Sequence, residues 1–175
     1  MYNSWEIDLS DSVVALESIK DTVLPKLISG DIHTIENQEN DILIKIDIKS
    51  GIDYIREDNN GLQGIAARVQ WGNAWNTFTI RSERHTGAKT ELEKRMYQIE
   101  NGYFYPAFTL QAYFDNREEN NLLSIAVIKT KTLYRLYQTN NDIFKSRKSD
   151  NKFVYVEWNK IKKHIKYYGI PKNTR

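Results

Sequence analysis

Apolar residues recur every three or four positions in four parts of the chain, which is the spacing of one face of an α-helix. This pattern predicts helices over residues 11–29, 91–101, 131–138 and 158–168. Pro25 removes one helix hydrogen bond, so a kink or a split is expected in the last turn of the first helix.

Two of these helices also have recognisable ends. One of the polar residues at 10–12 can cap the first helix, and Gly30 follows its end. Thr90 and Glu93 have the spacing of a capping box, which predicts where the second helix begins.

Alternating apolar and polar residues predict strands between the helices. Isoleucines at every second position predict a strand over 42–48, and residues 52–55 form a second, shorter candidate. Asn59-Asn60-Gly61 is a strong hairpin signal that leads to a return strand over 64–71, and residues 75–81 follow as another strand. Together these strands are predicted to form one continuous meander.

Three more strands are predicted over 108–114, 122–128 and 153–157, with a polar turn over 116–121 and a polar stretch over 139–151. The order of elements indicates an α/β (α+β) fold in a single domain, with a central mixed sheet built on the meander and flanked by helices. The chain beyond residue 130 is expected to form a basic C-terminal helical extension, 130–175.

Composition narrows the class of protein. The 175 residues are 40% hydrophobic and 27% charged and include no cysteine, which suits a globular chain without disulfides or cysteine-bound zinc. No apolar run approaches the roughly 20 residues of a membrane span, and the N-terminus lacks the pattern of a signal peptide. We therefore expect a cytoplasmic protein with no membrane partner.

Charge is distributed unevenly. Residues 1–58 carry 5 Lys/Arg against 13 Asp/Glu, whereas residues 59–175 carry 20 against 10. Carboxylates that hold a metal and basic residues that hold phosphates would give such a division in an enzyme acting on a polyanion. The alternative is that both sets are solvated surface.

A set of polar residues on the predicted meander suggests a phosphodiester-cleaving site. Asp53 is the first metal-ligand candidate, with Asp47 or Glu17 as a second carboxylate. On the paired strand, Arg68 and Gln70 share one face, where they could stabilise phosphate charge and orient a ligand. The alternative is a cross-strand ion pair between Asp53 and Arg68.

The sequence around these residues resembles the core of the PD-(D/E)XK, or restriction-endonuclease-like, nucleases over residues 11–100. Asp53 in Gly51-Ile52-Asp53-Tyr54-Ile55 matches the strand aspartate of that family, and Glu17 could match its helix acid. Within Gly64-Ile65-Ala66-Ala67-Arg68-Val69-Gln70, Arg68 falls where the family has lysine, and Ala66 where it has a second acid or glutamine.

The resemblance implies a Mg²⁺- or Mn²⁺-dependent nuclease, a hydrolase acting on DNA. Because Ala66 cannot bind a metal, the alternative is a catalytically inactive nuclease-like fold that acts through a protein partner or a homodimer, as an accessory protein of a phage or mobile element.

Two basic segments are candidates for contacts with nucleic acid. The first leads into the helix at 91–101 and offers phosphate-binding side chains: Arg81, Arg84, His85, Lys89, Lys94 and Arg95. The second is 145–175, with 10 Lys/Arg against 2 Asp/Glu, where Phe153 and Tyr155 could stack on bases. Alternatively, the first segment is only a solvated connection between a strand and a helix. In the second segment the lysines would form a solvated face, with Trp158 in the core.

Overall fold

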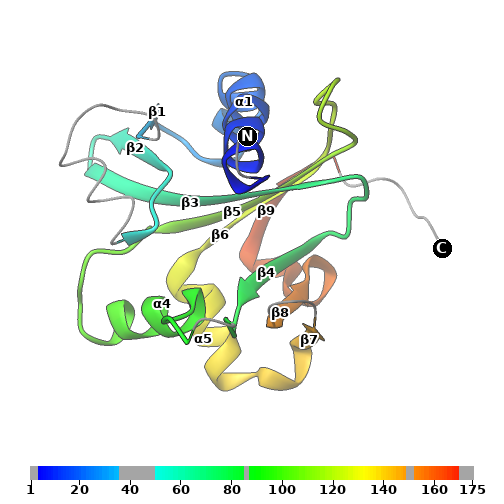
Figure 1. Ribbon diagram of the computed structural model, residues 1–175. Helices are drawn as coiled ribbons and strands as arrows, with labels where there is room; N and C mark the ends of the chain where they lie inside the picture. Colours follow the sequence, from blue (N-terminus) through cyan, green and yellow to red (C-terminus); the bar gives the residue numbers. More distant parts are fainter. Residues whose placement is uncertain (1–3, 36–49, 85–86, 149–151, 170–175) are drawn as a thin grey trace.

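A mixed six-stranded sheet forms the centre of the computed structural model, which describes residues 4–35, 50–84, 87–148 and 152–169 (Figure 1). The spatial order of its strands is β1-β2-β3-β5-β6-β9. These strands are β1 (Asp31–Thr34), β2 (Tyr54–Asp58), β3 (Gly61–Trp71), β5 (Phe108–Phe114), β6 (Leu122–Lys129) and β9 (Ile165–Tyr168). Only β3 and β5 pair in parallel among these neighbours. The chain is thus a single α+β domain.

A second, three-stranded antiparallel sheet packs below the first in Figure 1. It consists of β4 (Thr77–Arg81), β8 (Lys152–Glu157) and β7 (Lys145–Lys148), with β8 in the middle. The prediction of one continuous meander is therefore wrong at its last strand. The chain turns at Gly72, with φ +93°, and β4 then pairs with β8 instead of β3.

Several local predictions are confirmed. The hairpin between β2 and β3 turns at the predicted Asn-Asn-Gly sequence, since Asp58 pairs with Gly61. Strand β5 has the predicted bounds, and β6 and β8 lie within a residue of theirs. The strand predicted over 42–48 lies outside the described residues.

The helices cover both faces of the central sheet. They are α1 (Ser4–Lys20), α2 (Leu24–Leu27), α4 (Glu91–Glu100) and α5 (Thr130–Thr139). The first helix begins at Ser4, so residues 10–12 do not cap it. The split expected from Pro25 is confirmed: α1 ends at Lys20, and Pro25 lies in the first turn of a separate short helix, α2. The capping box of α4 is confirmed: the Glu93 N–H donates to the Thr90 hydroxyl at 3.2 Å.

The helix predicted over 158–168 is wrong. Residues Trp158–His164 form a kinked 3₁₀ segment, η2, and the chain then enters β9. Ile165 pairs with Ile128 of β6, so backbone hydrogen bonding to the sheet replaces the expected helical turn. The polar stretch over 139–151 also contains two elements that were not predicted, η1 (Asn141–Ile143) and strand β7. The C-terminal region therefore contributes strands to both sheets and is not a helical extension.

Two apolar cores lie on opposite faces of the central sheet. The first packs α1 and α2 against β2, β3, β5 and β6. The second fills the space between the central sheet, the second sheet and α5, with Trp158 at 1% exposure against Phe78 and Tyr113. No helix in the described ranges has the length and apolar character needed to cross a membrane.

We expect Trp158→Ala to lower the free energy of unfolding by about 3–5 kcal/mol, because it opens a cavity in the second core. Trp75→Ala makes the same chemical change at a side chain that is 60% exposed, and it should cost about 0.5 kcal/mol or less. Urea denaturation followed by circular dichroism compares the two variants. Equal losses of stability would contradict this assignment of the core.

Candidate functional site

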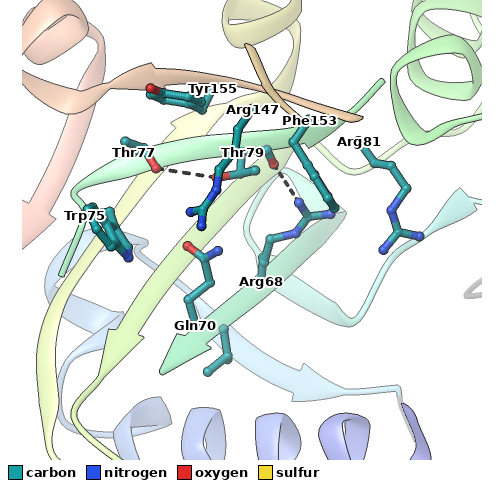
Figure 2. A pocket seen from close by; sticks show the side chains of 10 residues that line it. Arg68, Gln70, Trp75, Thr77, Thr79, Arg81, Arg147, Phe153 and Tyr155 are labelled. Atoms are coloured by element: carbon teal, nitrogen blue, oxygen red, sulfur yellow. Dashed lines mark hydrogen bonds between the residues drawn. The ribbon is translucent and has the colours of Figure 1, made fainter. Parts of the chain in front are cut away.

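Strand β3 presents two different faces. Ala67 and Val69 pack on the first core, beneath α1. Arg68 and Gln70, which alternate with them, point to the opposite side, toward the second sheet (Figure 2). The prediction that these two side chains share a face is confirmed.

A cavity of about 490 Å³ lies between β3 and the second sheet. Its walls come from β3, β4, β7, β8 and the segment before β4 (Figure 2). The lining residues are Arg68, Val69, Gln70, Trp75, Thr77, Thr79, Arg81, Arg147, Phe153 and Tyr155. Among these described residues there are three arginines and no carboxylate, so the walls favour an anionic ligand.

Arg68 links β3 to β4 and to the start of α4. Its Nη1 donates to the backbone oxygen of Thr79 at 3.0 Å, and its Nη2 to Glu91 Oε2 at 2.6 Å. The predicted alternative, an ion pair with Asp53, is therefore wrong: the carboxylate that pairs with Arg68 is Glu91.

Arg68 and Arg81 also share one aromatic ring. Their Cζ atoms lie 5.8 and 5.5 Å from the centroid of Phe153. Burial, followed by the charges of Arg68 and Arg84, lowers the pKa of Arg81. Arginine nevertheless stays protonated near neutrality, so Arg81 adds a partly buried positive charge to the cavity.

The start of β4 is fixed from the central sheet. The Tyr113 hydroxyl of β5 accepts from the Thr77 N–H at 3.1 Å and lies 2.9 Å from both the Thr77 carbonyl oxygen and its hydroxyl. Burial raises the pKa of Tyr113, so this phenol stays neutral and able to donate. The cavity wall is therefore held rigidly at the end where Trp75 lies.

Asp53 lies outside this cavity. Its Oδ2 accepts from the Ala67 N–H at 2.5 Å, directly before β2 begins. The residue borders a smaller cavity of about 170 Å³ whose other walls include Ser12 and Leu16 of α1. Arg68 borders this cavity too, but its guanidinium is hydrogen-bonded on the β4 side.

Glu17 is also engaged in structural contacts. The Thr34 hydroxyl donates to Glu17 Oε1, and Lys20 Nζ lies 2.7 Å from Oε2. Burial opposes ionisation of this carboxyl, but the hydrogen bonds from Lys20 and Thr34 outweigh it and lower the pKa of Glu17. Its acceptor oxygens thus already have partners.

The described residues do not by themselves fit the predicted metal site. In that part of the chain, no group of three or more His, Asp or Glu side chains lies close enough to hold a metal ion. Asp47, the remaining predicted ligand, lies outside the described residues. Binding of Mg²⁺ or Mn²⁺ stays a prediction.

The predicted phosphate-binding residues divide into three groups. Arg81 and Arg84 are half-buried near the cavity, whereas Lys89 and Lys94 are exposed. Arg95 is 6% exposed and donates to the backbone oxygen of Ser50 at 2.6 Å, so its assignment to nucleic-acid binding is wrong. It instead anchors α4 to the segment before β2. His85 lies outside the described residues.

Several residues that line the cavity were not grouped with Arg68 and Gln70 from the sequence. Phe153 and Tyr155 were candidates for stacking, but in a separate C-terminal segment. Trp75 was predicted only as the start of a strand, and Arg147 only as one of the basic residues of 145–175. Arg147 lies on a strand without apolar residues, and only the alternation of Lys145 and Arg147 could have indicated that strand.

Replacement of Glu17 by Gln tests whether this carboxylate has a structural role. Because its folded pKa lies below the ordinary 4.5, the ionised side chain stabilises the fold fully above pH 4.5, and this stabilisation disappears as pH falls through the folded pKa. We expect the free energies of unfolding of wild type and Glu17→Gln to differ most near neutral pH and to become equal in acid. Glu118→Gln, at an exposed turn, is the matched control and should show no such convergence.

No protein-family model matches this chain, and no curated protein matches it. The interpretation of the cavity therefore depends on its own geometry.

Proposed function

We propose that this protein binds nucleic acid, with the phosphate backbone held by the arginines of the cavity between the two sheets. The observation that carries the proposal is the lining itself: Arg68, Arg81 and Arg147 with aromatic rings between them and no carboxylate among the described lining residues. Arginine donates two parallel hydrogen bonds to phosphate, and its flat guanidinium stacks on aromatic rings.

The charge of residues 59–175 supports a polyanion as ligand. Residues 59–175, which supply every lining residue of the cavity, carry 20 Lys/Arg against 10 Asp/Glu. An excess of this sign steers polyanions toward the surface and favours contacts with phosphate over contacts with neutral ligands.

The proposed fold family is restriction-endonuclease-like. A helix, α1, that precedes the β2–β3 hairpin, with α2 and β1 between them and Asp53 directly before β2, supports this assignment. The function proposed here is binding, because the described carboxylates Asp53 and Glu17 are engaged by Ala67 and by Thr34 and Lys20. Metal-dependent cleavage would require Asp47, which lies outside the described residues.

We expect Arg81→Gln and Arg147→Gln each to weaken binding of a fluorescent single-stranded oligonucleotide about tenfold. A hydrogen bond to a charged group contributes about 1.5 kcal/mol or more, and about 1.4 kcal/mol is tenfold in affinity. The slope of log affinity against log salt should also fall by about 0.7 for each phosphate that the variant no longer neutralises. Fluorescence anisotropy across a salt series measures both quantities.

The matched control is Arg135→Gln, which removes the same charge from an exposed position of α5 that borders a different cavity. It should leave affinity and salt slope close to those of wild type. Equal weakening in all three variants would mean that binding depends only on net charge. No binding by wild type at low salt would refute the proposal and favour the protein-partner alternative.

A further inference from the structure

Trp75 is the most exposed aromatic residue of the cavity lining. Its side chain is 60% exposed, although it borders the cavity just before β4 begins. Single exposed apolar side chains are common on protein surfaces, so exposure alone carries no inference. The position of Trp75 matters because it lies at the mouth of a cavity that three arginines and two further aromatic rings also line.

The backbone next to Trp75 is held firmly in place. Asn76 adopts a left-handed conformation with φ 51°, which is uncommon for a residue other than glycine. Its Oδ1 accepts from the buried Ser124 hydroxyl at 2.7 Å, and its carbonyl oxygen accepts from the backbone N–H of Trp158 at 2.8 Å. These two hydrogen bonds, to β6 and to the start of η2, fix where the indole ring emerges.

The cavity has an aromatic end and a cationic end. Figure 2 shows Trp75 and Tyr155 on one side, Phe153 and Arg81 on the other, and Arg147 between them. The Phe153 ring already lies against two guanidinium groups, whereas Trp75 is 60% exposed. A flat ring entering at the aromatic end would bring attached phosphates toward the arginines.

Polar groups line the wall between these two ends. The Gln70 Oε1 accepts from the buried Gln111 at 3.4 Å, which directs the Gln70 NH₂ group away from that contact. The Thr77 and Thr79 hydroxyls lie 3.4 Å apart on β4. These groups can donate to and accept from the edge of a heterocyclic base.

We propose that the cavity receives an unpaired base of a single-stranded nucleic acid, stacked on Trp75, while Arg81 and Arg147 hold the adjacent phosphates. This inference rests on the proposed nucleic-acid function and names its substrate class. In a duplex, neighbouring base pairs cover the faces of each base, so a ring can reach Trp75 only from a strand whose bases are unpaired.

The test compares four ligands by fluorescence anisotropy and competition. They are an oligothymidylate of about 20 nucleotides, longer than the usual site of a single-strand binder, an abasic strand of the same length, the corresponding duplex, and thymidine monophosphate. The abasic strand keeps the phosphates and removes every base. Each ligand is measured with wild type, Trp75→Ala, Trp75→Phe and Phe104→Ala, the last a control at a 54% exposed ring outside the cavity lining.

We expect oligothymidylate to bind wild type about tenfold more tightly than the abasic strand, as one stacked base allows. Trp75→Ala should remove most of this difference without changing the affinity for the abasic strand, and Trp75→Phe should restore part of it. Phe104→Ala should behave as wild type. The duplex and the monophosphate should compete weakly.

Two results would overturn the inference and leave nucleic-acid binding intact: equal affinity for the thymidylate and abasic strands, or tighter binding of the duplex. Thymidine monophosphate competing as well as the strand, with sensitivity to Trp75→Ala, would identify a free nucleotide as ligand and overturn the single-strand proposal. Failure of both strands and the duplex to bind would instead refute the proposed function itself.

Discussion

The burial of β5 and β6 on both of their faces determines how the rest of the chain is arranged. Alternate residues of β6, such as Val127 and Ala126, belong to the first and the second core. A sheet with two apolar faces needs cover on both sides. Helices α1 and α2 cover one face, and α5 with the second sheet covers the other (Figure 1).

The cavity arises because the second sheet extends beyond the apolar strands β5 and β6 and also lies over β3. The second sheet is positioned by its contacts with β5 and β6, but β4 also passes over β3, where the facing side chains are Arg68 and Gln70. Charged and amide groups at these positions cannot be packed as a dry core without complete pairing. Glu91 and Thr79 satisfy Arg68, while Arg81 and Arg147 add further positive charge to the same space.

Local signals in the sequence were sufficient for most single elements. The capping box at Thr90, the Asn-Gly turn and the apolar run of β5 each depend on residues close together in the chain. The pairing of β4 with β8 has no local signal, so the site was expected at Asp53, on the hairpin, rather than between the sheets. The apolar spacing at 158–168 is compatible with a helix and also with the observed 3₁₀ segment followed by a strand. The pairing of this strand with β6, which the local sequence does not show, determines which structure forms.

The pairing of Thr77 with Glu157 has a consequence for how the site forms during synthesis. Contacts between residues so distant in sequence form late, after the entropy of closing the long intervening loop has been overcome. A nascent chain that ends before β7 and β8 lacks Arg147, Phe153 and Tyr155 and leaves β4 without its strand partner. An incomplete chain therefore has no cavity, and the space between the two sheets exists only once β7 and β8 have been translated and have folded onto β4.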